Sequence, residues 1–276
     1  MPNFALTYRL AYIHDMSNKA LPSIAILYED AHCAVINKPA HLMVHGDGKA
    51  EGPFLTDWIL ETFPGAKGVG ETARSIEGDD IERSGIVHRL DRETSGALIV
   101  AKTKQGYDSL KAQFQDRTIL KKYLALVWGE VQEEFGTINR PIGRSGSDFR
   151  KWSAQRGTRG ETREAETYWT RMWTGTYQNM PNSVSPDLGK RFSLIEAEPK
   201  TGRTHQIRVH FNAVNHPVVG DSLYAPKRPY LFGLKRLALH SHVVSFDTVE
   251  GKRVTVTAPL PEDMSAALTE LGIELK

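Results

Sequence analysis

We predict an α+β fold in which a mixed, mostly antiparallel β-sheet is flanked by a few helices. Two observations lead to this prediction. Short apolar runs typical of strands outnumber the segments with helical spacing. The two kinds of segment also follow no regular β-α-β order, which a doubly wound parallel sheet requires. With 276 residues the chain is long enough for one large domain or two modest ones.

The predicted strands are apolar or alternating runs bounded by turn residues. The first two are separated by EDAH and form a hairpin that Pro39 closes. Residues 120–129 alternate, with Tyr123, Ala125 and Val127 on one side. The complete set of predicted strands is 24–28, 33–37, 97–100, 120–129, 163–173, 191–199, 237–246 and 253–259.

The predicted helices have apolar residues three or four positions apart. The first helix has Leu55, Trp58 and Ile59 at this spacing and stops at Pro64. The complete set of predicted helices is 54–63, 103–117, 204–215 and 262–271. Stretches rich in Gly, Pro, Asn, Ser or charge predict a mobile loop at 65–84 and a connection or insertion at 175–189.

Composition gives only weak evidence about partners. The net charge of +2 is too small to indicate nucleic acid by itself, so that inference depends on local clusters of Lys and Arg. The single cysteine, Cys33, excludes a disulfide framework and fits a reducing compartment. Polar residues interrupt every apolar stretch near the N-terminus, so we expect no signal peptide, no membrane span and a cytoplasmic location.

The motif SGIVHRLDRETSGALIV, residues 84–100, places a polar segment between two apolar runs. Its carboxylate, Asp91, has His88, Arg89 and Arg92 within three positions, and nearby cations keep a carboxylate ionised. The alternative is a capped turn with surface ion pairs. A second polar motif, KTGRTHQIRVH, places Arg203 in a turn before a helix, and we expect Arg203 to point into the site of Asp91.

Basic charge is clustered in residues 143–163, where only Asp148 and Glu161 are acidic. Phe149 and Trp152 lie among the cations, so this segment combines phosphate contacts with surfaces on which bases stack. A solvated, flexible hairpin tip is the alternative. The candidate RNA-binding residues of the segment are Arg144, Arg150, Lys151, Arg156, Arg159 and Arg163.

Neither a cofactor nor a metal is predicted. The chain has no GxGxxG after a strand and no GxxxxGK[ST], which argues against a dinucleotide or NTP site. His205 and His210 are five positions apart and share a helical face poorly, and no Cys or carboxylate cluster completes a ligand set.

These motifs resemble those of the RluA-type pseudouridine synthases, which isomerise uridine to pseudouridine within structured RNA. The likeness rests on GIVHRLDRETSGALIVAKT, ILYEDAHCAVINKPAHLMVH, KKYLALVWG, KTGRTHQIRVHFNAVNHPVVGDSLY, LALHSHVVSF and VTVTAPLP. It covers about residues 24 to 262. The resemblance implies a pseudouridine synthase fold. It also implies that Asp91 is the catalytic aspartate, Tyr123 lies against the target base, Arg203 ion-pairs with Asp91, and Arg89 helps to displace the nucleotide.

The implied reaction breaks the N-glycosidic bond, turns the base and rejoins it through carbon, so it needs no cofactor. Two routes are open for Asp91, and the sequence does not choose between them. On the first, Asp91 attacks or stabilises a cationic C1′; on the second, a glycal route, it abstracts a sugar proton. Tyr123 is a candidate to accept the C5 proton. Because a base inside folded RNA must be flipped out, we assign that work to Arg89 and the 143–163 segment.

The resemblance also divides the chain. We expect an N-terminal extension at 1–23, too short for the S4 RNA-binding domain of many members, then a catalytic domain at 24–262 and a C-terminal helix at 263–276. Two departures concern one loop: His41 replaces the family's usual Gly, and HGDG at 45–48 replaces a turn that commonly contains Pro.

Three hypotheses follow. The first is an isomerase acting on structured ribosomal or transfer RNA, which we expect to be a monomer without membrane attachment. The second is a catalytically idle RNA-binding or chaperone module on the same fold. The third is a metal-dependent hydrolase that uses His88, Asp91 and His205.

Overall fold

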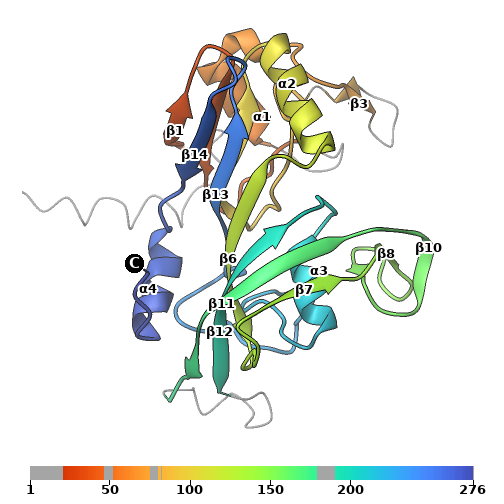
Figure 1. The fold of residues 1–276 in the computed structure, drawn as a ribbon, viewed down its shortest axis with the longest axis vertical. Helices are drawn as coiled ribbons and strands as arrows, with labels where there is room; N and C mark the ends of the chain where they lie inside the picture. The colour runs from red at the N-terminus through yellow and green to blue at the C-terminus, as the bar shows by residue number, and fades with distance from the viewer. Residues whose placement is uncertain (1–20, 47–51, 75–79, 82, 179–189, 276) are drawn as a thin grey trace, which may run out of the picture.

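Nine of the described strands pair into one sheet that runs the length of the molecule (Figure 1). The computed structural model describes residues 21–46, 52–74, 80–81, 83–178 and 190–275. The strand order is β1-β2-β5-β13-β6-β12-β11-β7, and β14 pairs with β13. The strands are β1 (Ile26–Glu29), β2 (Cys33–Lys38), β5 (Ser95–Ala101), β6 (Leu120–Trp128), β7 (Phe135–Asn139), β11 (Glu166–Thr176), β12 (Arg191–Pro199), β13 (Leu239–Asp247) and β14 (Arg253–Thr257).

Only the pairing of β5 with β13 is parallel in this sheet, so the prediction of a mixed, mostly antiparallel sheet is confirmed. The parallel pair is short and brings Gly96 opposite Ser241. Gly96 has a φ of 111°, and a Cβ at this position would lie 2.2 Å from the carbonyl oxygen of Ser241. Glycine is therefore required where the Asp91 motif enters the middle of the sheet.

Helices cover both faces of the sheet. Alternate residues of β2 and β5 face opposite ways: Ile36 packs in one core with Leu55 of α1, whereas Ile99 packs in another core with Leu110 of α2. Burial on both faces explains why the strand-forming run 97–100 is apolar throughout. The helices are α1 (Leu55–Thr62), α2 (Lys104–Gln115), α3 (Gln206–Ala213) and α4 (Glu262–Glu270).

The structure corrects two sequence-based expectations about loops. Residues 143–163, expected as a loop with a flexible hairpin tip as the alternative, contain strands: β8 (Ile142–Ser145), β9 (Trp152–Ser153) and β10 (Thr158–Arg163) form a three-stranded sheet there. We call it the basic sheet, and it projects away from the central sheet (Figure 1). Residues 65–84, expected as a loop, contain a 3₁₀ turn at Pro64–Ala66 and the two short paired strands β3 (Ala73–Arg74) and β4 (Asp80–Ile81).

Other expectations fall partly outside the described residues. These are most of the N-terminal extension 1–23, the second half of the HGDG turn at 45–48, and most of the connection 175–189. Within the described part of the chain, no helix has the length and apolar character needed to cross a membrane.

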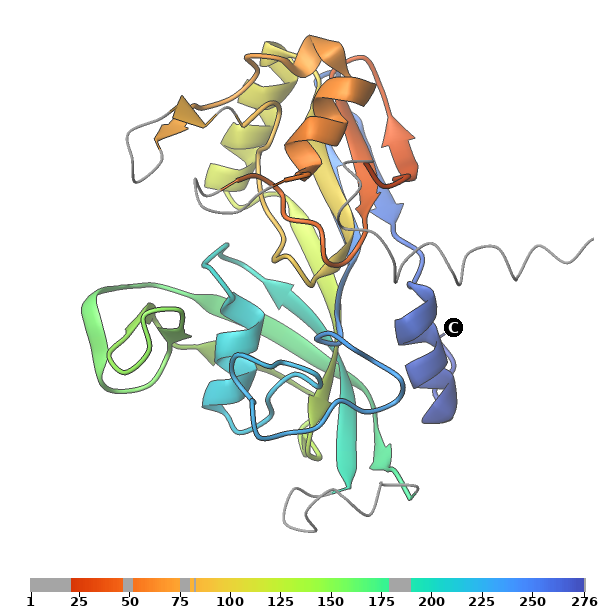
Figure 2. The same ribbon diagram turned by 180° about the vertical axis from the view of Figure 1, so that it is seen from behind.

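The last helix, α4, is tied to the Asp91 motif through Arg236. This arginine is 2% exposed, and its guanidinium donates to both carboxylate oxygens of Asp263 at 2.6 and 2.8 Å. Its Nη1 also donates to the carbonyl of Glu93 at 3.2 Å. The helix lies on the opposite side of the molecule from the basic sheet (Figures 1 and 2). Arg236 therefore links the loop around Asp91 to the start of α4.

His41 occupies a backbone conformation that favours glycine, since its φ is 64°. We expect His41→Gly to raise the free energy of unfolding by about 1 kcal/mol, because Gly removes the Cβ strain of the left-handed region. The melting temperature should rise by roughly 2–3 °C. The carbonyl of His41, which accepts from Arg92 Nε at 3.4 Å, is kept. Urea unfolding measures the gain, and His41→Ala, which retains a Cβ, is the matched control. Equal stability of the two variants would contradict this account.

Candidate active site

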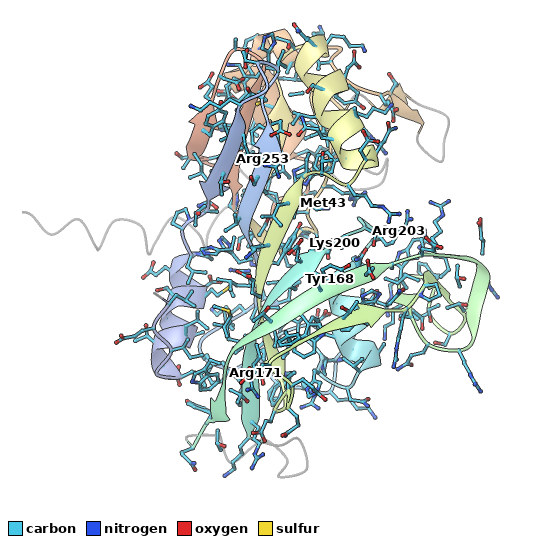
Figure 3. The ribbon with its side chains drawn as sticks, viewed as in Figure 1. Met43, Tyr168, Arg171, Lys200, Arg203 and Arg253 are labelled. Atoms are coloured by element: carbon cyan, nitrogen blue, oxygen red, sulfur yellow. The ribbon has the colours of Figure 1, made fainter. Side chains whose placement is uncertain are left out.

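A basic cleft of about 750 Å³ lies between the loop that carries Asp91, the end of α2 and the loop before α3. Its acidic lining residues are Asp91 and Glu198. Figure 3 shows Arg253 on one side of this region and Lys200 and Arg203 on the other. A concave site with this excess of positive charge suits a polyanion. The cations that line it are Arg89, Arg117, Lys121, Lys200, Arg203, Arg208 and Arg253.

Asp91 projects into the cleft from a turn whose other residues anchor it. Leu90 is 4% exposed, and the backbone N–H of Thr94 donates to the carbonyl of Asp91 at 3.1 Å. The carboxylate is 21% exposed. Its Oδ2 accepts from Arg208 Nη1 at 2.9 Å, and its Oδ1 lies 3.9 Å from His205 Nε2. One oxygen is thus held by a guanidinium, while the other has a longer approach to an imidazole.

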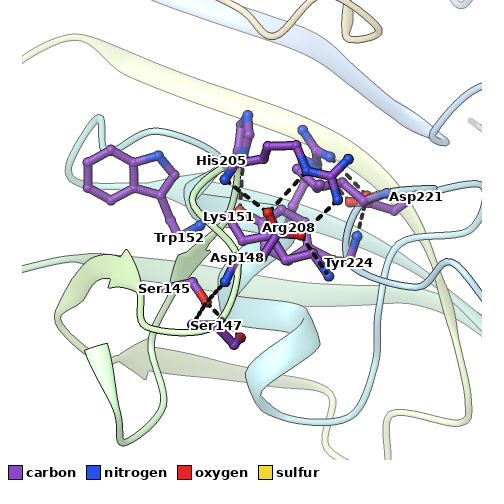
Figure 4. Close-up of polar contacts among 11 residues, drawn as sticks. Ser145, Ser147, Asp148, Lys151, Trp152, His205, Arg208, Asp221 and Tyr224 are labelled. Carbon is purple, nitrogen blue, oxygen red and sulfur yellow. Dashed lines mark hydrogen bonds and ion pairs between the residues drawn. The ribbon is translucent and has the colours of Figure 1, made fainter. Parts of the chain in front are cut away.

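Arg208 itself is fixed by a second acid. Its Nε and Nη2 donate to the two oxygens of Asp221 at 2.7 and 2.9 Å, and the Asp221 side chain is 0% exposed (Figure 4). Burial opposes the charge of Arg208, but the hydrogen bonds and charges of Asp221 and Asp91 outweigh it and raise the pKa of the guanidinium. Arg208 therefore remains a cation with its plane oriented by Asp221.

His205 precedes α3 with a φ of 56° and a side chain that is 19% exposed. Burial lowers its pKa, although the charge of Asp91 acts in the opposite direction. The imidazole is therefore neutral at pH 7. Its Nδ1 lies 2.9 Å from the hydroxyl of Tyr224. Asp91 thus has one cationic and one neutral neighbour.

An ionised carboxylate held at one oxygen, in a cleft lined with cations, suits attack on or stabilisation of an electron-poor carbon in a polyanionic substrate. A comparison with known families identifies the substrate class. The model described as RNA pseudouridylate synthase matches residues 32–213 of this chain. The chain belongs to this family. The synthase is therefore an isomerase that acts on uridine in RNA.

Individual relatives agree with this assignment. The synthase is 36% identical over 248 residues to an uncharacterized RNA pseudouridine synthase of Synechocystis sp., covering 89% of this chain and 68% of that protein. It is 35% identical over 281 residues to ribosomal large subunit pseudouridine synthase D of Xylella fastidiosa, covering 95% and 74%. Among solved structures, human RNA Pseudouridylate Synthase Domain Containing 1 matches with a TM-score of 0.66 and 28% identity, covering 91% and 90%. The predicted pseudouridine synthase fold is confirmed.

Tyr123 of β6 lines the cleft of the synthase and is 8% exposed. Burial raises its pKa to about 12, a hydrogen bond with Ser241 acts in the opposite direction, and the charge of Asp91 raises it further. A phenol with this pKa keeps its proton at neutral pH. The sequence located this tyrosine in the cleft, and its expected role as acceptor of the C5 proton stays a prediction.

Arg203 is not the ion-pair partner of Asp91, contrary to our expectation. Its Nε donates to the carbonyl of Glu164 at 2.9 Å, and Arg208 takes the position on Asp91. The reason is that Arg203 precedes α3 and is held by the carbonyl of Glu164, whereas Arg208 lies within α3, in its first turn. In the structure α3 is buried almost all round, so its polar residues must have buried partners, but the sequence alone did not show this burial.

Lys38 is a second residue that the sequence reasoning missed. Its side chain lies in the core, and its Nζ donates to the carbonyls of Pro39, Leu42 and Arg92 at 2.7, 2.8 and 3.3 Å. Burial lowers its pKa to about 7, opposed by the charge of Asp91. Because it bonds to the residue after Asp91, Lys38 fastens the catalytic loop to the end of β2.

Arg89 and His88 precede Asp91 in the same loop and have different surroundings. Arg89 is exposed at the cleft, and its Nη1 donates to His45 Nε2 at 3.5 Å. His88 accepts at Nε2 from the backbone N–H of Ile99 at 2.9 Å, and burial lowers its pKa to about 3. His88 is thus a structural acceptor here. Among the described residues, no group of three or more His, Cys, Asp or Glu is arranged to hold a metal ion.

The predicted RNA-binding cations differ in how far they are engaged. Arg144 stacks over Trp152, 4.3 Å from the ring centroid. Arg150 donates to both oxygens of Asp148 at 3.0 and 2.9 Å, and Lys151 lies 3.9 Å from the same carboxylate. The remaining three are exposed and have no ion pair within the described residues: Arg156, Arg159 and Arg163.

Proposed function

We propose that this synthase flips specific uridines out of structured ribosomal or transfer RNA and isomerises them without a cofactor. The observation that carries the proposal is the Asp91 carboxylate, held at Oδ2 by Arg208 in a cleft lined with cations. Ribosomal RNA is favoured as the substrate because several similar proteins are named ribosomal large subunit pseudouridine synthase D. One chain supplies every residue to which we assign a role in the reaction, so a monomer suffices. The single cysteine, Cys33, is buried, and this fits a cytoplasmic location.

Four residues that line the cleft, together with the basic sheet, have roles in this proposal. Asp91 acts at the sugar, either on C1′ or on a sugar proton, and Arg208 keeps it ionised when the entering base expels water. Tyr123, which stays protonated, packs against the target base. Arg89 at the cleft mouth and the basic sheet contact the RNA around the flipped nucleotide and repay the few kcal/mol that unstacking costs.

Pseudouridine mapping tests this function. Carbodiimide-dependent reverse-transcriptase stops are recorded on total RNA from cells with the gene intact, deleted, or deleted and rescued with Asp91→Asn. We expect at least one stop to disappear on deletion and to return with the wild-type gene but not with the variant. If every stop persists and the purified protein binds RNA transcripts without modifying them, the idle RNA-binding module is the better description.

Lys121 provides a separate prediction about RNA affinity. Its ammonium lies in the cleft, 5.6 Å from the centroid of the Phe114 ring, and has no ion pair within the described residues. Burial lowers its pKa to about 8, the charge of Lys200 lowers it further, and Glu198 acts in the opposite direction. A phosphate is the partner that such a cation lacks. Lys121→Met should therefore weaken RNA binding and reduce the slope of log K against log salt by about 1.

The same lysine predicts a pH dependence. A bound phosphate raises the pKa of Lys121, so binding takes up a proton once the pH passes the free value of about 8. The RNA affinity of the wild type should fall as pH rises from 7 to 9, and that of Lys121→Met should fall less. Filter binding measures both curves. Lys122→Met is the matched control, because Lys122 is already paired with Glu196 at 2.7 Å. Equal effects of the two variants would count against a phosphate at Lys121.

A further inference from the structure

A chain of polar contacts connects the basic sheet to Asp91, and the hydroxyl of Tyr224 is its centre. Figure 4 shows Tyr224 together with Trp152 and His205. The backbone N–H of Trp152 in β9 donates to this hydroxyl at 3.0 Å. The hydroxyl lies 2.9 Å from Nδ1 of His205, whose Nε2 lies 3.9 Å from Asp91 Oδ1. The surface that carries the candidate RNA-binding cations is thus two side chains away from the catalytic carboxylate.

One arrangement of protons satisfies every contact in this chain. Because the Tyr224 oxygen accepts from Trp152, its own hydrogen is available to His205 Nδ1. Burial raises the pKa of Tyr224 to about 12, which keeps that hydrogen in place, and burial lowers the pKa of His205. A neutral imidazole that accepts at Nδ1 carries its hydrogen on Nε2. In this arrangement the N–H of His205 faces Asp91 Oδ1, the oxygen that Arg208 does not hold.

The surrounding structure holds this arrangement firmly. His205 keeps a left-handed backbone, which for a residue other than glycine persists only where neighbours determine it. The Tyr224 ring lies 5.1 Å from the guanidinium carbon of Arg208, and its backbone N–H donates to Asp221 Oδ1 at 3.0 Å. Tyr224 also packs with Trp152 in a small core below the basic sheet. Tyr224 therefore contacts both neighbours of Asp91 and the RNA-facing sheet.

We propose that Tyr224 and His205 are positioning residues that transmit RNA binding at the basic sheet to Asp91. A shift of the sheet and Tyr224 of about 1 Å toward the cleft brings His205 Nε2 within hydrogen-bond distance of Asp91 Oδ1. Both oxygens of the carboxylate are then oriented, one by Arg208 and one by His205, when RNA is bound. The proposal rests on the proposed function, because it assigns the basic sheet to RNA.

Rates at saturating RNA test the transmission. The probe is a transcript of large-subunit ribosomal RNA carrying tritium at C5 of uridine, and isomerisation releases the label. Tyr224→Phe keeps the ring but loses the hydroxyl. His205→Asn tolerates the left-handed backbone and keeps a polar atom near Nδ1 but loses the group that faces Asp91. We expect each to lower kcat roughly five- to tenfold with KM within about twofold, and the double variant to be no slower than either.

A double-mutant cycle separates transmission from mere support. Arg159→Ala/Arg163→Ala should raise KM and lower kcat in the wild-type background but only raise KM in the Tyr224→Phe background. Tyr230→Phe, on a half-exposed tyrosine outside the cleft lining, is the matched control and should match the wild type. Provided that the wild type releases tritium, two outcomes overturn the inference while the proposed function stands. Either Tyr224→Phe has the wild-type kcat, or the effects of Tyr224→Phe and of the double arginine substitution on kcat multiply.

A second measurement needs no RNA. Long-range ¹⁵N–¹H NMR of the free protein should show His205 protonated at Nε2 and bare at Nδ1, with the Nδ1 resonance shifted in Tyr224→Phe and unchanged in Tyr230→Phe. A proton on Nδ1, or identical spectra for wild type and Tyr224→Phe, overturns the inference on its own. Absence of tritium release by the wild type, in contrast, overturns the proposed substrate and with it the transmitted effect on rate.

Discussion

Asp91→Asn is expected to lower the rate of pseudouridine formation by more than about 10³-fold. The amide has nearly the shape of the carboxylate, but it is a poor nucleophile, a poor base and no counterion for a cationic sugar. Folding should be almost unaffected. The side chain is 21% exposed, and Arg208 keeps its bonds to Asp221, so the free energy of unfolding should change by about 1 kcal/mol or less.

RNA affinity makes this prediction specific. Removal of a negative charge from a cleft lined with cations should leave binding unchanged or tighten it. Tritium release, filter binding and thermal unfolding of the same preparation measure the three quantities. A variant that turns over at a tenth of the wild-type rate would show that Asp91 assists the reaction without carrying it.

Arg208→Met should cause the largest loss of stability among the single substitutions discussed. It leaves Asp221, whose side chain is fully buried, without its guanidinium, and breaking a buried ion pair from one side costs about 3–5 kcal/mol. For a chain of this size the melting temperature should fall by roughly 10 °C. Activity should also fall, because the carboxylate of Asp91 loses the donor on Oδ2.

The double variant Arg208→Met/Asp221→Asn distinguishes these two effects. Asn at 221 removes the uncompensated charge and keeps an acceptor for the backbone N–H groups of Leu223 and Tyr224. Thermal unfolding should therefore show that much of the stability returns, whereas tritium release should remain low. Recovery of activity together with stability would mean that Arg208 acts only as part of the scaffold.

Much of the fold could be predicted from the sequence because local patterns determine it. The alternation of residues 120–129 and the helical spacing of 54–63 both correspond to elements of the structure, β6 and α1. The basic sheet was missed for a physical reason. Its strands are short and mostly polar, so their composition does not distinguish them from a loop. They are held by backbone pairing and by the small core in which Trp152 and Tyr224 pack.

The sequence predicted the part of the candidate site that lies in a recognisable motif, and it missed the residues whose position depends on tertiary contacts. Asp91 stands out because cations surround it in the sequence, and the structure places it in the cleft. Its partner could not be chosen between Arg203 and Arg208 by spacing, since the choice depends on Asp221 lying behind α3. Lys38 resembles any lysine after a strand, and only the three carbonyls around its ammonium show that it is enclosed.

The position of β13 has a consequence for how the molecule assembles. Strands β1, β2 and β5 form one half of the sheet, and β6, β12, β11 and β7 form the other. Among the described strands, only β13, residues 239–247, pairs with both halves. The two halves can form early, but their strands are not joined in one sheet until this late segment inserts between them. Asp91 belongs to the first half and Arg208 to the second. We therefore expect the contact between Asp91 and Arg208 to be among the last to form during synthesis, so that a nascent chain without β13 has both residues but not the site that they form.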